Sequence, residues 1–176
     1  TWSIEKLYSV IAHLYNASLR NEAQLKATKI DEFDPILLKG KNTRPLRPTL
    51  FDFLAHRALE FFVNDESGVT KPAYQFKLDD PLIFAGAADF IKAKFPAKDT
   101  ASLQYKALRL LQDILGNHIA DNNPDALIDA DLIRLAFVHN NSTLEDKDAR
   151  YEQALQRIEQ TYPNNPAAAQ AGYLRG

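Results

Sequence analysis

The sequence predicts an all-α fold of antiparallel helical hairpins, with about seven to eight helices. Apolar residues recur at spacings of three and four along most of the chain, which is typical of helices with one buried face. Glycine is scarce, with six among 176 residues. At four places a capping side chain comes directly before a proline, which is a typical helix start. These places are Asp34-Pro35, Asp80-Pro81, Asn123-Pro124 and Asn165-Pro166.

Three helices are expected in the first part of the chain. The first covers about Ser3–Arg20 and is followed by a polar connection. A short helix then runs over Pro35–Lys39 and stops at Gly40, a residue that favours a left-handed cap. The third covers Thr49–Asn64, because Thr49 and the carboxylate three residues later form a variant of the capping box.

The second part is expected to hold five helices after a loop over Asp65–Asp80. Alternating Tyr74, Phe76 and Leu78 in that loop predict a short extended segment. The helices are expected over Pro81–Lys94, over about Thr100–Ile119, over Pro124–His139, from a capping box at Ser142-x-x-Glu145 to near Thr161, and from Pro166 to the chain end.

Composition excludes several classes of function. The formal net charge is −2, so the chain lacks the basic surplus of a nucleic-acid-binding protein. The chain has no run of about 18 apolar residues, so no membrane span is predicted. The absence of cysteine excludes disulfides and thiolate metal sites within this chain. Because the chain does not begin with methionine, we expect a fragment of a longer precursor.

No motif predicts catalysis. The chain has no phosphate-binding glycine loop, no His-Glu-x-x-His and no Gly-x-Ser-x-Gly. The four histidines are never within one helical turn of each other, so no local metal pair forms. Asp52 and His56 are four residues apart, and we interpret them as a helix-surface pair rather than a catalytic dyad. We therefore expect no catalytic residue, no metal and no cofactor.

Binding candidates are few. Arg44, Arg47 and Arg57 cluster along the chain and could clamp an anion or a carboxylate. The interpretation that we favour is that they tie their loop to helix carbonyls or to nearby aspartates. Trp2 and Tyr74 are the two aromatic residues that could form an exposed platform for a glycan.

The last third resembles tetratricopeptide repeats. The pattern Tyr151-x-x-Ala154-Leu155, followed by Tyr162-Pro163-Asn164-Asn165-Pro166, is similar to the join between two such repeats. The Trp-x-x-Leu-Gly signature is absent. The resemblance implies tetratricopeptide-like or αα-superhelix packing. We expect a single helical domain over 1–176, with a subdivision into a helical part over 1–95 and repeat-like hairpins over 100–176.

A second resemblance covers most of the chain. The strings LYNASLRNEAQLKATKIDEFDPILLKG, RPLRPTLFDFLAHRALEFF and NPDALIDADLIRLAF are similar to the amino-terminal helical region of large bacterial alpha-2-macroglobulin-like proteins. That family implies an exported, often lipid-anchored periplasmic parent that traps or inhibits proteases. Neither its bait segment nor its Cys-x-Glu-Gln thioester has a counterpart here, so the resemblance assigns no functional residue.

Three functional hypotheses follow. The first is a non-catalytic interaction or spacer domain of an alpha-2-macroglobulin-like protein, which is periplasmic or outer-membrane associated. Its partners would be other domains of the same polypeptide, proteases or envelope proteins. The second is a glycan-binding, tetratricopeptide-type protein of outer-membrane nutrient uptake. The third is an enzyme whose pocket joins Asp52, His56 and an arginine.

Overall fold

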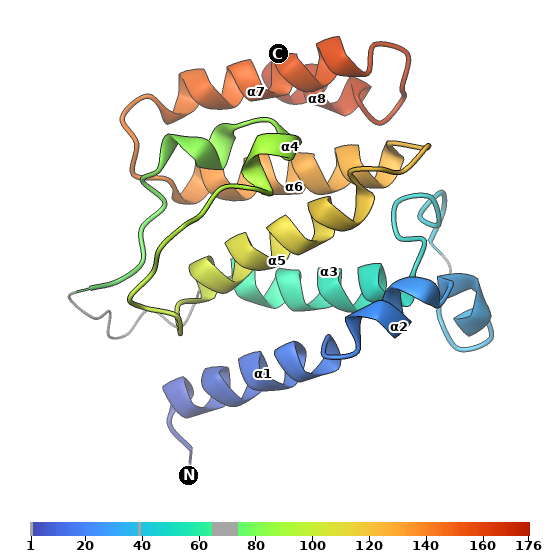
Figure 1. Cartoon of the computed structure of the whole chain (residues 1–176), viewed down its shortest axis with the longest axis vertical. Coiled ribbons are helices and arrows are strands. Elements are labelled where there is room, and N and C mark those ends of the chain that lie inside the picture. The colour runs from blue at the N-terminus through green and yellow to red at the C-terminus, as the bar shows by residue number, and fades with distance from the viewer. Residues whose placement is uncertain (1, 39, 65–73) are drawn as a thin grey trace. The chain divides into compact units, whose positions relative to one another are not determined.

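The computed structural model describes residues 2–38, 40–64 and 74–176. Within these ranges the regular elements are eight α-helices and two 3-10 helices (Figure 1). The described residues form no strand, only two isolated bridges that join Lys29 to Thr49 and Leu78 to Ser142. The prediction of an all-α fold with seven to eight helices is confirmed.

The chain divides into two compact units. The first comprises the described residues within 1–76 and 97–110, and the second comprises residues 77–96 and 111–176. Each unit is therefore assembled from two separate stretches, and α5 (Leu103–His118) runs from the first into the second. The subdivision into 1–95 and 100–176 stays a prediction, because residues 77–96 group with the second unit and residues 97–110 with the first.

The first unit is organised around α3 (Leu50–Val63). Helices α1 (Ile4–Ser18) and α2 (Glu22–Ala27) both pack against it. Tyr8 and Tyr15 of α1 contact the ring of Phe61, with centroids 5.4 and 5.5 Å away. Lys26 of α2 lies over the ring of Phe51, 4.7 Å from its centroid. Aromatic contacts thus attach α1 to its unit along one side only.

The start of α3 has the predicted capping box. The Thr49 hydroxyl accepts the amide of Asp52 at 3.3 Å, and the Asp52 carboxylate accepts the amide of Thr49 at 2.9 Å. Asp52 is fully buried, so both charge and cap are shielded from water. The helix buries one apolar face, namely Phe51, Ala55, Ala58, Leu59 and Phe62.

The predicted helix over Pro35–Lys39 is wrong for the described residues. The chain forms a 3-10 helix, η1, over Ile30–Phe33, and Pro35 follows it in a turn. Lys39 lies outside the described residues. Backbone hydrogen bonds from Ile30 to Pro48 (3.0 Å) and from Leu50 to Thr28 (2.9 Å) set the register of this segment. These long-range contacts decide where the chain turns. Helix α2 was not predicted, because the sequence indicated a polar connection there.

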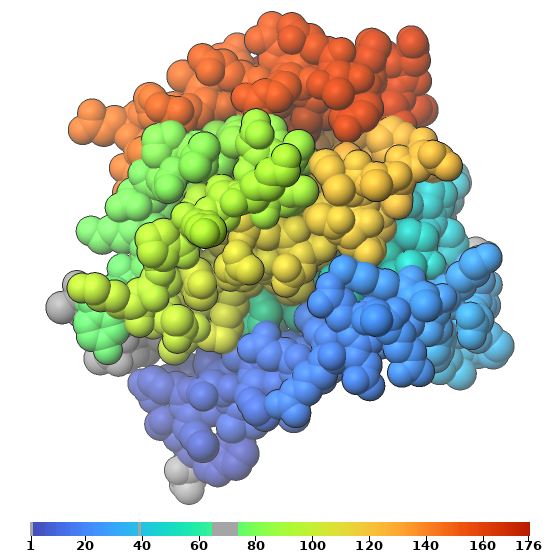
Figure 2. All heavy atoms as spheres, viewed as in Figure 1, coloured from blue at the N-terminus to red at the C-terminus, as the bar shows by residue number. Residues whose placement is uncertain are grey.

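The second unit surrounds α6 (Asp125–Asn141), of which ten residues are buried. The 3-10 helix η2 (Pro81–Phe84) and α7 (Lys147–Thr161) both pack on α6. Helix α8 (Ala169–Arg175) packs along α7, and Figure 2 shows the two in direct contact, in orange and red. The remaining short helix, α4, covers Ala87–Phe90.

The predicted single helix over Pro81–Lys94 is broken into η2 and α4. Asp80 caps the start as expected, because its carboxylate accepts the Leu82 amide at 2.8 Å. The backbone then becomes extended at Ala85 and Gly86. Arg134 donates to the carbonyl of Ile83 at 2.7 Å, and a second arginine, Arg157, donates to the next carbonyl. Tertiary contacts therefore take the carbonyls that a continuous helix would use.

The predicted capping box at Ser142 is also wrong. The Ser142 hydroxyl donates to the carbonyl of Leu78 at 2.9 Å and accepts the amide of Leu144, so it stabilises a turn. Leu78 lies in the loop predicted over Asp65–Asp80, of which residues 65–73 lie outside the described ranges. Helix α7 begins five residues later, at Lys147. The last helix begins at Ala169, because Asn165 first closes a turn with Ala167.

Candidate functional site

A pocket of about 200 Å³ opens within the second unit. It is bounded by α4, α6, α7 and the residues that follow α5 and α7. Most of its lining is apolar, and four polar side chains join it. The lining residues are Gly86, Ala87, Ala88, Ile119, Leu127, Ile128, Asp131, Ala154, Arg157, Ile158, Thr161 and Tyr162. A small apolar pocket with a few polar groups is the arrangement expected of a ligand site.

A buried ion pair lies at one wall of this pocket. Arg134 is fully buried, and its Nε donates to Asp131 Oδ1 at 2.8 Å. Its Nη1 donates to the carbonyl of Ile83, and its guanidinium carbon lies over the ring of Phe90, 4.5 Å from the centroid. Within the described part of the chain, Arg134 Nη2 has no hydrogen-bond partner. Burial lowers the pKa of Arg134, whereas Asp131 opposes that shift.

The polar wall combines one acceptor and several donors. Asp131 faces the pocket with its Oδ1 already bound by Arg134. Arg157 is exposed at the rim, and its Nη1 donates to the carbonyl of Phe84 at 3.2 Å. Partial burial raises the pKa of Tyr162, and the nearby Asp131 charge raises it further. The Arg157 charge also lowers the pKa of Arg134, so these groups share one electrostatic neighbourhood.

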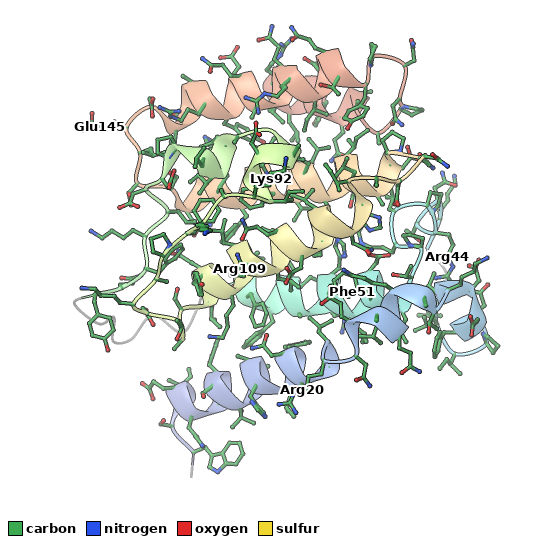
Figure 3. The ribbon with its side chains drawn as sticks, in the orientation of Figure 1. Arg20, Arg44, Phe51, Lys92, Arg109 and Glu145 are labelled. Atoms are coloured by element: carbon green, nitrogen blue, oxygen red, sulfur yellow. The ribbon has the colours of Figure 1, made fainter. Side chains whose placement is uncertain are left out.

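The three predicted arginines have separate partners. Arg44 forms ion pairs with Asp31 (3.0 Å) and with Asp34 (Figure 3). Arg47 donates to the adjacent carbonyl of Leu46 at 2.7 Å, and Arg57 lies 3.7 Å from a glutamate one turn along α3. The contacts of Arg44 fit the interpretation that an arginine ties its loop to nearby aspartates, whereas for Arg47 and Arg57 that interpretation stays a prediction. A shared anion clamp stays a prediction.

The other sequence candidates also lie in the first unit. His56 Nδ1 lies 2.8 Å from the backbone oxygen of Asp52, whose carboxylate serves the helix cap. Trp2 and Tyr74 are 64% and 62% exposed, as an aromatic platform requires. Whether the two rings share one surface stays a prediction.

Sequence reasoning missed the pocket. The one available signal was Asp131 and Arg134, a charged pair three residues apart within the apolar string that predicted the sixth helix. Nothing in the sequence connects Arg157 or Tyr162 to that pair, because both come from later elements. Such a site becomes visible only when the helices are packed.

The rest of the described structure sets the context of this pocket. In the described ranges, no three His, Cys, Asp or Glu side chains form a group that could hold a metal ion. Among the same residues, no helix is both long and apolar enough for a membrane span. No protein-family model, curated protein or solved structure matches this chain.

Proposed function

We propose that this chain is a non-catalytic helical domain that makes protein–protein contacts within a large bacterial alpha-2-macroglobulin-like, protease-trapping protein. The parent would be periplasmic or outer-membrane associated and anchored as a lipoprotein. The partners would be other domains of the same polypeptide, proteases or envelope proteins. The resemblance of three sequence strings supports the family. An exposed apolar row on α1 is the observation that carries the interaction role.

This row follows from the geometry of α1. At 100° per residue, Leu7 and Leu14 lie roughly 20° apart around the helix, and so do Tyr8 and Tyr15. The two tyrosines face Phe61 of α3. The two leucines form a neighbouring row that stays 45% and 61% exposed. Figure 2 shows α1, in blue, at the surface of the molecule.

An apolar row of this kind is typical of an interaction surface. Exposed Ile4 extends the leucine row toward the helix start. Within α1 only Ala12 is buried, so the helix has more apolar surface than its unit covers. Contiguous exposed apolar residues mark protein-binding surfaces more often than isolated ones. A partner helix or domain surface would cover the row.

The tetratricopeptide-like arrangement belongs to the same proposal. The pairing of α7 with α8 supports it, as does the burial of the small residues Ala154, Ala168 and Ala171. Small residues allow paired helices to approach closely, as stacked hairpin repeats require.

Site-specific photo-cross-linking in the intact parent protein tests this proposal. A photo-reactive amino acid at position 7 or 14 is expected to cross-link to another domain of the polypeptide or to an envelope protein. Positions 9 and 16 provide the control, because Ser9 and Asn16 have the same spacing and are exposed on another face of α1. Equal yields from both pairs of positions would contradict the interaction surface. Absence of β-sandwich domains from the full-length gene would contradict the family.

A glycan-binding role is the second candidate, and the exposure of Trp2 and Tyr74 favours it. Exposed aromatic faces are suited to stacking on sugar rings. A glycan array with Trp2→Ala and Tyr74→Ala variants tests this role, with Tyr173→Ala as the control because Tyr173 is a well-exposed tyrosine of the other unit. Saturable binding that only the first two variants lose would support it. Absence of binding would exclude it.

A further inference from the structure

We propose that the pocket in the second unit binds a small aliphatic α-amino acid in its zwitterionic form. The ammonium group would contact Asp131, the carboxylate would contact Arg157 and Tyr162, and the side chain would occupy the apolar floor. This inference is independent of the protein–protein role, because the leucine row of α1 contributes nothing to this pocket.

The size of the pocket limits its ligand. Pockets for drug-sized ligands have about 300–1,000 Å³. The volume here is about 200 Å³, which corresponds to roughly seven waters at their share of liquid volume. A single amino acid is of this scale, whereas a nucleotide or an oligosaccharide is larger. The ligand is therefore a small molecule rather than a polymer segment of several residues.

The charges select a molecule that carries both signs. Asp131 and Arg157 are the two charged side chains among the lining residues. Asp131 accepts the Arg134 Nε–H at its Oδ1. A bound ammonium would donate to the same carboxylate from the pocket. Because the hydrogen bond from Arg134 holds this carboxylate, the Asp131 side chain stays oriented without a ligand.

Arg157 provides the complementary donor. Its Nη1 is fixed by the Phe84 carbonyl, which orients the guanidinium at the rim. The remaining guanidinium N–H groups and the Tyr162 hydroxyl can donate to a carboxylate, the anion that arginine binds best.

The floor selects an aliphatic side chain. Ile119, Leu127 and Ile158 line it, together with small alanines. These residues offer no hydrogen bond to a polar side chain, so a serine or aspartate ligand would lose its hydration without compensation. A branched aliphatic amino acid such as leucine fits this chemistry. Binding is expected to strengthen about fourfold for each methylene from alanine to leucine.

Isothermal titration calorimetry with three leucine derivatives tests the proposal on the intact chain. Leucine presents both charges, N-acetyl-leucine only the carboxylate, and leucinamide only the ammonium. Leucine is expected to bind at one site and at least about tenfold more tightly than either derivative, because each loses a charged hydrogen bond. If N-acetyl-leucine or leucinamide binds as tightly as leucine, the zwitterion assignment is overturned. A leucine Kd above about 10 mM also overturns it.

Substitutions locate the site. Arg157→Gln and Tyr162→Phe remove a donor each, and the first is expected to weaken leucine binding by about tenfold or more. Arg150→Gln is the matched control, because Arg150 lies on the same helix outside the pocket. Ala88→Phe places a bulky side chain at an exposed lining position and should block binding while the protein stays folded. Unchanged binding in Arg157→Gln, or an equal loss in Arg150→Gln, overturns the location.

Discussion

Helices α1 and α6 are similar in length, with 15 and 17 residues, yet they differ in what they bury. Helix α1 buries one residue, Ala12, and leaves leucines exposed. Helix α6 buries ten residues, including the charged Asp131 and Arg134. The comparison shows that the informative residues are those that break the simple rule of apolar inside and polar outside. On α1 they form the exposed row proposed as a contact surface, and on α6 they lie at the wall of a pocket.

The largest expected effect is the loss of the ion pair in α6. Asp131→Ala leaves the Arg134 guanidinium buried without its carboxylate and is expected to lower the free energy of unfolding by about 3–5 kcal/mol. Chemical denaturation monitored by circular dichroism measures this. On α1, Lys6→Ala is expected to change stability by less than about 0.5 kcal/mol, because Lys6 is exposed. Similar losses in both variants would refute the contrast.

Leucine truncation compares the two helices directly. Leu135 of α6 is fully buried, so Leu135→Ala is expected to cost about 2–5 kcal/mol through lost packing and a cavity. Leu14→Ala on α1 is expected to cost less than about 0.5 kcal/mol, because Leu14 is mostly exposed. The denaturant midpoints of the two variants test this pair, provided that the dependence of unfolding free energy on denaturant concentration is unchanged. A large loss for Leu14→Ala would show that the row on α1 is already covered.

Helix caps give a smaller effect. Thr49→Ala removes a reciprocal cap whose partner, Asp52, is buried, and it is expected to cost about 1–2 kcal/mol. Ser3→Ala removes the exposed cap of α1, where the hydroxyl accepts the Lys6 amide at 3.3 Å, and should cost about 0.5 kcal/mol. Thermal unfolding of both variants ranks the two caps. The reverse order would contradict the role assigned to the buried capping box.

The smallest effect concerns alkaline pH. The pKa of Tyr162 is raised above its ordinary value of 10.0, so the folded chain holds this proton more tightly than the unfolded chain. The associated stability is complete below about pH 10 and is lost as pH rises further. Tyr162→Phe should therefore reduce the loss of stability above pH 10. Tyr173→Phe should leave it unchanged, because Tyr173 is exposed.

Local sequence patterns were sufficient for the long helices. The Thr49–Asp52 cap and the apolar stripe behind it place α3 within one residue of its predicted bounds. Helices α1, α5 and α6 also lie close to their predicted ranges. These signals work because capping and periodic burial depend on residues only three or four positions apart.

Local patterns failed where distant groups compete for the same backbone atoms. Asp80-Pro81 opens a helix as predicted, but Arg134 and Arg157 take the carbonyls that would extend it. Ser142 has the sequence of a cap, but its hydroxyl binds Leu78 instead. A hydrogen-bonding group that finds a buried partner far along the chain is no longer available to its neighbours.

The sequence by itself determined the class of fold, the main helices and the absence of thiol chemistry. Those properties rest on composition and on short-range periodicity. Only the tertiary structure decided which charged residues are buried and which apolar ones are exposed, and it alone assembled Asp131, Arg157 and Tyr162 around one pocket. The physical reason is that burial belongs to the packed arrangement of helices, so a residue's environment depends on elements far away in sequence.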